Sequence, residues 1–137
     1  MIKQGFHIGD RDWWVMVYYD VCPSEISEIE ETVRATGASE EDARRACDNL
    51  MHPNTGLTIT DYASHTTFMA VSRATSSEQM FDTIVHELKH LTEHISNYYG
   101  LDPKTEISAY LQGEVGRNMW CAAAMVLCPG CEKEREV

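Results

Sequence analysis

The sequence has no long hydrophobic run and little positive charge. No stretch approaches the roughly 18 consecutive apolar residues that a membrane-spanning helix needs. The short apolar run at 13–19 lies between Asp12 and Asp20 and lacks a small-residue cleavage site, so we identify no secretion signal and expect a cytoplasmic protein. Lys and Arg total 11 against 22 Asp and Glu, and the net charge of -11 would repel a nucleic-acid backbone or an anionic membrane. The composition therefore predicts neither as a partner, and it carries no information on oligomeric state.

Cysteine is also sparse. The five cysteines, an odd number, favour reduced thiols over a disulfide framework. Cys128 and Cys131 have the C-x-x-C spacing of a metal knuckle, and Cys121 precedes them on the same stretch. A structural zinc site needs four ligands, and the sequence has no second such pair. We therefore prefer the interpretation of reduced thiols to that of a second metal site.

The length of 137 residues and the 43% hydrophobic content suit one core, so we predict a single domain over 1–127 and a polar tail over 128–137. Aromatic and β-branched residues, capping residues and glycine stops mark the expected elements. These are a strand at 12–21, helices at 24–37 and 39–51, a hairpin of 57–62 and 65–72, a long helix from Ser76 to Gly100, and a last helix starting with Asp102 as N-cap and Pro103. The pattern predicts an α+β fold with a small, mainly antiparallel sheet.

The stretch "TIVHELKHLTEH" places His86, Glu87 and His90 in the order H-E-x-x-H within the long helix. An apolar stripe containing Phe81, Val85, Leu88 and Ile95 is expected to face the core, which turns both histidines away from it. Residues four apart lie on neighbouring turns, so both imidazoles can reach one Zn²⁺ while the carboxylate beside them acts as a general base. The alternative is a solvated helix face that carries two histidines and a glutamate.

A catalytic zinc site needs a third protein ligand. The chain turns at Gly100, so the next helix can fold back across the histidine face and project Glu106 at the metal, which is the ligand we predict. Glu93 and His94, on the long helix itself, stay open as competitors. Tyr110, one turn beyond Glu106, could donate its hydroxyl to an oxyanion, although a tyrosine at this spacing is also compatible with the core.

The segments "HTTFMAVSRATSSEQMFDTIVHELKHLTEHI" and "EISAYLQGEVG" resemble the gluzincin type of zincin metallopeptidases, and in particular small zincins of phages and mobile elements. The resemblance implies a zincin-like domain in which His86, His90 and Glu106 bind zinc and Glu87 is the base. It also implies that residues 65–72 form the sheet edge along which a peptide or protein substrate lies. We therefore expect a zinc-dependent metallopeptidase. The alternative is a non-catalytic zinc-binding protein of the same fold that holds a protein partner.

Overall fold

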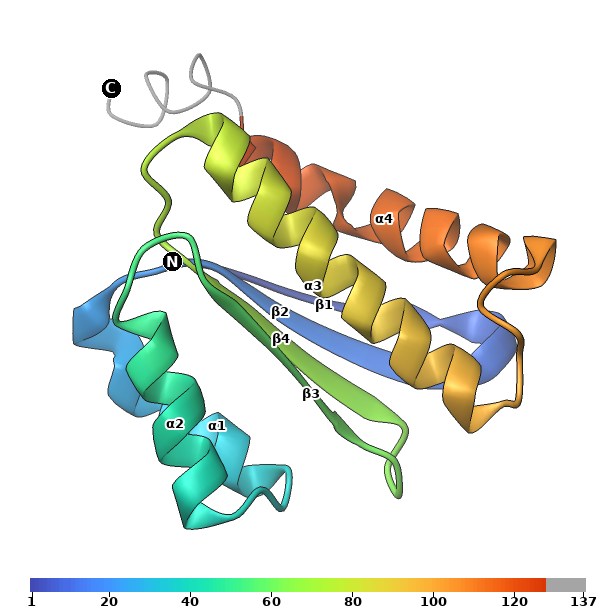
Figure 1. Cartoon of the computed structure of the whole chain (residues 1–137), viewed down its shortest axis with the longest axis horizontal. Helices are drawn as coiled ribbons and strands as arrows, with labels where there is room; N and C mark the ends of the chain where they lie inside the picture. The colour runs from blue at the N-terminus through green and yellow to red at the C-terminus, as the bar shows by residue number, and fades with distance from the viewer. Residues whose placement is uncertain (128–137) are drawn as a thin grey trace.

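The chain folds into three layers, with helices on both faces of a central sheet (Figure 1). A computed structural model describes residues 1–127. The elements are β1 (Ile2–Ile8), β2 (Trp13–Val21), α1 (Ile26–Ala35), α2 (Glu40–Leu50), β3 (Gly56–Asp61), β4 (Thr66–Ser72), α3 (Ser77–Tyr98) and α4 (Glu106–Leu127), with short 3-10 turns at Gly9–Arg11 and Pro23–Glu25. The predicted α+β class is confirmed.

The sheet is mixed, with the strand order β1-β2-β4-β3. β1 pairs antiparallel with β2, and β3 pairs antiparallel with β4. The central pair, β2 and β4, is parallel, with Val15 opposite Thr67. Neither β1 nor this parallel pairing was predicted from the sequence. The prediction of a mainly antiparallel sheet therefore holds for the two outer strand pairs and not for the central one.

The position of β4 corrects a second expectation. The segment 65–72 was predicted to be the free sheet edge, but β4 is paired on both sides and the edge strand is β3. The burial pattern gives the physical reason. Every residue of β4 from Thr67 to Ser72 is buried, whereas β3 has only Leu57 in that class. A strand that is covered on both faces belongs in the interior of a sheet.

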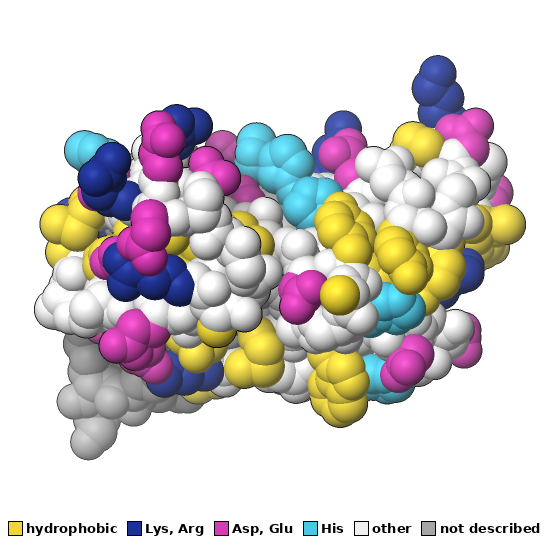
Figure 2. All heavy atoms as spheres, turned by 90° about the horizontal axis from the view of Figure 1, so that it is seen from below, with side chains coloured by type: hydrophobic (Ala, Val, Ile, Leu, Met, Phe, Trp, Pro, Cys, Tyr) yellow, Lys and Arg dark blue, Asp and Glu magenta, His cyan; other side chains and the backbone are white. Residues whose placement is uncertain are grey.

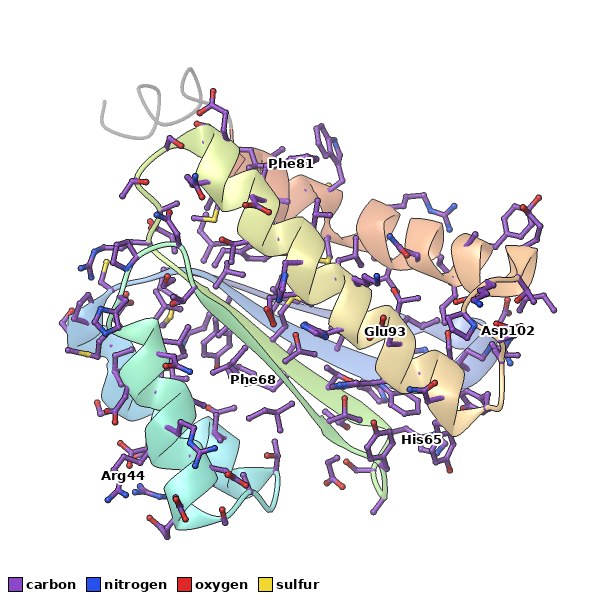
Figure 3. All side chains as sticks on the ribbon, viewed as in Figure 1. Arg44, His65, Phe68, Phe81, Glu93 and Asp102 are labelled. Carbon is purple, nitrogen blue, oxygen red and sulfur yellow. The ribbon has the colours of Figure 1, made fainter. Side chains whose placement is uncertain are left out.

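Each face of the sheet has its own apolar cluster. The cluster under α3 and α4 includes Trp13, Val15, Met69, Leu91 and Val115. The cluster under α1 and α2 is built around Phe68, Ile29, Val33 and Leu50. Figure 3 shows Phe68 on the side of the sheet that faces α1 and α2. None of the helices within residues 1–127 is long and apolar enough to cross a membrane.

The helix starts agree with the sequence in two cases and differ in a third. The hydroxyl of Ser39 accepts the backbone N–H of Asp42, and that of Ser76 accepts the N–H of Gln79, as expected of N-caps. The last helix was predicted to begin at Asp102 and Pro103, but α4 begins at Glu106. The Asp102 carboxylate instead accepts the backbone N–H of Lys104 within the turn before the helix, so it caps that turn rather than the helix.

Candidate metal centre

The helix α3 buries only part of the expected stripe, since Ile95 lies in the core and Leu88 packs against it. Its core-facing apolar residues are Met80, Ile84, Leu91 and Ile95, whereas Phe81 and Val85 are exposed. Both stripes recur at three- and four-residue steps, so the periodicity alone did not separate them. The consequence concerns Glu87, which falls within the buried stripe rather than beside it.

His86 and His90 face each other across one helical turn on the outer side of α3. Their Nε2 atoms are 3.1 Å apart, and the two rings are inclined at 76°. The side chains are 66% and 46% exposed. Two nitrogens bound to one tetrahedral zinc ion at the usual 2.0–2.1 Å lie roughly 3.3 Å apart. The separation is therefore compatible with two ligands of a single ion, and it also suits a hydrogen bond from one ring to the other.

Glu87 turns toward the sheet but keeps one oxygen near the histidines. The residue is only 4% exposed. The hydroxyl of Thr58, on β3, donates to its Oε1 at 2.9 Å, and its Oε2 lies 3.9 Å from Nε2 of His86. One ligand atom from each of His86, Glu87 and His90 lies within 4.8 Å of the others. Within residues 1–127 this is the group of His, Cys, Asp and Glu side chains with metal-binding geometry.

Two surface hollows flank His86. The first, of about 200 Å³, lies between the start of β3 and α3 and includes Thr55, Gly56 and Glu87 in its lining. The second, of about 400 Å³, lies between α3 and α4 and is lined by His86, His90, Glu93 and Gln112, among others. Asp82 lines both. An ion held between the two imidazoles would therefore be reachable from solvent on either side.

Glu93 lies beside His90 on the open side of the site. Its Oε2 is 3.9 Å from Nδ1 of His90, and its Oε1 is 4.0 Å from Nζ of Lys89. Figure 3 shows Glu93 on the part of α3 turned away from the sheet. Nδ1 is the ring nitrogen that does not face His86. At 3.9 Å the carboxylate is close enough for a charge interaction but too far for a hydrogen bond, so a small movement would be needed for it to accept the Nδ1 proton and hold the ring with Nε2 directed at an ion.

Glu106, the predicted third ligand, is not part of this group. It is exposed, as the first residue of α4. The contact that fixes this end of α4 joins the hydroxyls of Ser108 and Ser96 at 3.1 Å. Ser96 lies six residues beyond His90, which is about 9 Å along the helix axis. The residue that α4 presents to the second hollow is Gln112.

Tyr110 is also remote from the histidines. It is 75% exposed and lines a separate hollow with Asp10 and Arg11 from the connection between β1 and β2. The reason is the orientation of α4, which buries Ser108, Leu111, Val115 and Met119. The opposite stripe, which carries Glu106 and Tyr110, therefore points to solvent.

His94, the other competitor, has a different partner. Its Nδ1 is 2.9 Å from the hydroxyl of Thr60 on β3, and Thr60 contacts Thr67, which accepts the indole N–H of Trp13. Burial lowers the pKa of His94 from its ordinary value, and the nearby His90 lowers it further. These contacts direct its ring into the sheet and away from the other two histidines.

Cys128 and Cys131 lie outside the described residues, and Cys121 is exposed as a free thiol.

Thr58 and Gly56 are the residues of the site that sequence reasoning missed. Both precede the motif by about thirty residues and belong to β3. No local sequence pattern indicates which residues of this strand contact α3. The signal available was the alternation of Gly56, Thr58 and Thr60, which places three small or polar residues on one face of an edge strand.

Comparisons of the chain with protein-family models, with curated proteins and with solved structures gave no match.

Proposed function

We propose that the protein is a zinc-dependent hydrolase that cleaves peptide bonds, with a zincin-like arrangement of sheet and helices. His86 and His90 would supply two of the three protein ligands that a catalytic zinc ion needs, and Glu87 would be the general base; within residues 1–127 the structure brings no further His, Cys, Asp or Glu side chain to this group as the third ligand. The observation that carries the proposal is the close group of two imidazoles and one buried carboxylate on neighbouring turns of α3. A carboxylate adjacent to a metal site but directed past the ligands is the arrangement that hydrolysis by an activated water requires.

The chemistry divides between the ion and the protein. Bound zinc lowers the pKa of a water molecule toward 7 and polarises a carbonyl group. Oε2 of Glu87 lies on the histidine side and can accept the proton of the attacking water. The same carboxylate can then transfer that proton to the leaving amine, so that it acts first as a general base and then as a general acid. His86 and His90 contribute neutral nitrogens and keep the site open toward both hollows.

A peptide substrate has a place to bind at the edge strand. β3 pairs only with β4, so its other edge retains unpaired backbone groups next to the hollow that contains Glu87. An extended peptide added along that edge would lie beside the histidines and pair through main-chain hydrogen bonds. This replaces β4, which the sequence had suggested, with β3 as the proposed substrate edge.

The test combines metal content with cleavage. We expect wild-type protein to bind about one zinc per chain and to cleave members of a broad peptide library, and Glu87→Gln to keep the zinc but lose cleavage. His86→Ala should lose both. Glu78→Gln, an exposed carboxylate in the first turn of the same helix, is the matched control and should change neither. Zinc binding without cleavage of any peptide would support the non-catalytic alternative instead.

A further inference from the structure

The inner face of β3 is adapted to two side chains of α3. Alternate residues of a strand point to opposite faces, and Leu57 and Ile59 pack in the cluster under α1 and α2. The residues between them, Thr58 and Thr60, turn to α3, where their hydroxyls contact Glu87 and His94. The edge strand therefore presents one polar group to the site and another to the neighbouring histidine.

The two oxygens of Glu87 are not equivalent. Oε1 accepts the Thr58 hydroxyl at 2.9 Å, which is a well-formed hydrogen bond. Oε2 is on the side of His86. Because the side chain is nearly fully buried, the bond to Thr58 fixes the orientation of the carboxylate and keeps its other oxygen directed toward a water between the histidines.

Gly56 permits this close contact between strand and helix. A Cβ at position 56 would lie 2.6 Å from Cγ and 3.0 Å from Cδ of Glu87, and 3.2 Å from the backbone oxygen of Ala70. Cγ of Glu87 is nearer than real Cβ contacts allow, whereas Cδ and the backbone oxygen of Ala70 are closer than most such contacts, and that oxygen is part of the sheet. A glycine is therefore needed here for space rather than for an unusual backbone angle.

We infer that Thr58 is a positioning residue for the general base, and that Gly56 provides the space in which the Thr58–Glu87 pair forms. The inference rests on the proposed function for its catalytic consequence, but the orientation of Glu87 is a property of the metal-free protein. Loss of the Thr58 hydroxyl frees the plane of the carboxylate to turn, which lowers the fraction of molecules in which one of its oxygens is directed at the site.

The kinetic experiment compares Thr58→Val, Thr58→Ser and Thr60→Val. We expect Thr58→Val to lower kcat by about tenfold or more, the size expected when a hydrogen bond to a charged group is lost. KM and zinc affinity should remain within about twofold, since the histidines are untouched. Thr58→Ser should restore most of kcat. Thr60→Val removes the same kind of hydroxyl from the same strand face but contacts His94, so kcat should stay at the wild-type value.

A second measurement needs neither metal nor substrate. In crystal structures of the metal-free proteins, the Glu87 carboxylate should have one orientation in wild type and in Thr58→Ser. It should adopt more than one orientation in Thr58→Val and in Thr58→Ala, which serves if the valine variant does not fold. A single wild-type orientation in both hydroxyl-free variants would overturn the inference. If the orientations behave as expected but wild-type protein cleaves no peptide, the proposed function fails and the positioning of Glu87 stands.

Discussion

The middle of α3 and its C-terminal end carry histidines at the same four-residue spacing, yet the surroundings of these histidines differ. His86 and His90 lie on the open side of the helix with their nitrogens directed at each other. His94 continues the series but hydrogen-bonds Thr60 on the sheet. Each four-residue step rotates a side chain by about 40°, so two steps move the third ring from solvent to the sheet. Regular spacing therefore predicts a pair of metal ligands but not a third.

The C-terminal end is dominated by aromatic packing. Trp13 is fully buried, stacks on His65 at a centroid distance of 4.9 Å and meets Tyr98 and Tyr99 edge-on. Figure 2 shows a cluster of hydrophobic side chains toward one end of the face that it presents, with histidine side chains beside it and others elsewhere on that face. The two regions share one helix, and within residues 1–127 the group of side chains that could hold a metal ion lies in its middle. The predictions below separate stability at one end from metal binding in the middle.

The largest effect is expected from Trp13→Ala, which removes the centre of the aromatic end. We expect it to lower the free energy of unfolding by about 3–5 kcal/mol, the usual cost of truncating a buried tryptophan. The fraction that remains folded should bind zinc as wild type does. Trp14→Ala, the exposed neighbour on the opposite face of β2, should cost about 1 kcal/mol or less. Chemical denaturation measures both, and equal losses would refute the assignment of stability to the buried ring.

Glu93→Ala is expected to have the next largest effect, this time in the middle of α3. Removing the carboxylate beside Nδ1 of His90 leaves that ring free to turn. We expect zinc affinity to fall roughly 10–100-fold, as it does when an outer carboxylate partner of a ligating histidine is lost. Competition with a coloured chelator measures the change. Unchanged affinity in Glu93→Ala would show that the carboxylate neither orients His90 nor reaches the ion.

His94 should contribute a pH-dependent part of the stability. Its pKa in the folded protein is lowered from 6.5, chiefly by burial, while Glu93 opposes the shift. The unfolded chain therefore binds more protons than the folded chain, so stability is complete above pH 6.5 and declines as the pH falls toward the folded pKa. In His94→Gln the free energy of unfolding should decrease less steeply over this acidic window. A steeper decrease would contradict the assigned direction.

The smallest effect is expected from Glu106→Ala. The sequence predicted loss of the metal, but the exposed position of Glu106 at the start of α4 predicts zinc affinity within about threefold of wild type. The same chelator competition decides between the two. Loss of zinc would mean that α4 closes over the histidines when the ion binds, which would restore the original ligand assignment.

Local patterns were enough to predict most helices and the histidine pair. Ser39 and Ser76 marked helix starts correctly, and the spacing of His86 and His90 placed both on one side of α3. The buried stripe of that helix was misassigned because the apolar residues Phe81 and Val85 compete with a stripe that contains a charged residue, Glu87. A buried glutamate is expected only when its hydrogen-bond partner is known.

The other incorrect predictions have the same cause, because they too depend on contacts between residues distant in sequence. Thr58 lies on a strand distant in sequence, and its contact with Glu87 depends on the order of the sheet. The parallel pairing of β2 with β4 and the rotation of α4 depend on the same long-range packing. No repeat within the sequence encodes these, so the sequence could not predict where Glu106 and β4 lie relative to the two histidines.

The most direct test of the account measures zinc affinity in three proteins, namely wild type, His90→Ala and His94→Ala. Wild type should bind about one zinc per chain, and His90→Ala should lose more affinity than the 100-fold limit expected for an outer partner. His94→Ala should bind within about threefold of wild type. Retained binding in His90→Ala, or loss of binding in His94→Ala with the fold intact, would contradict the assignment of the metal centre to the middle of α3.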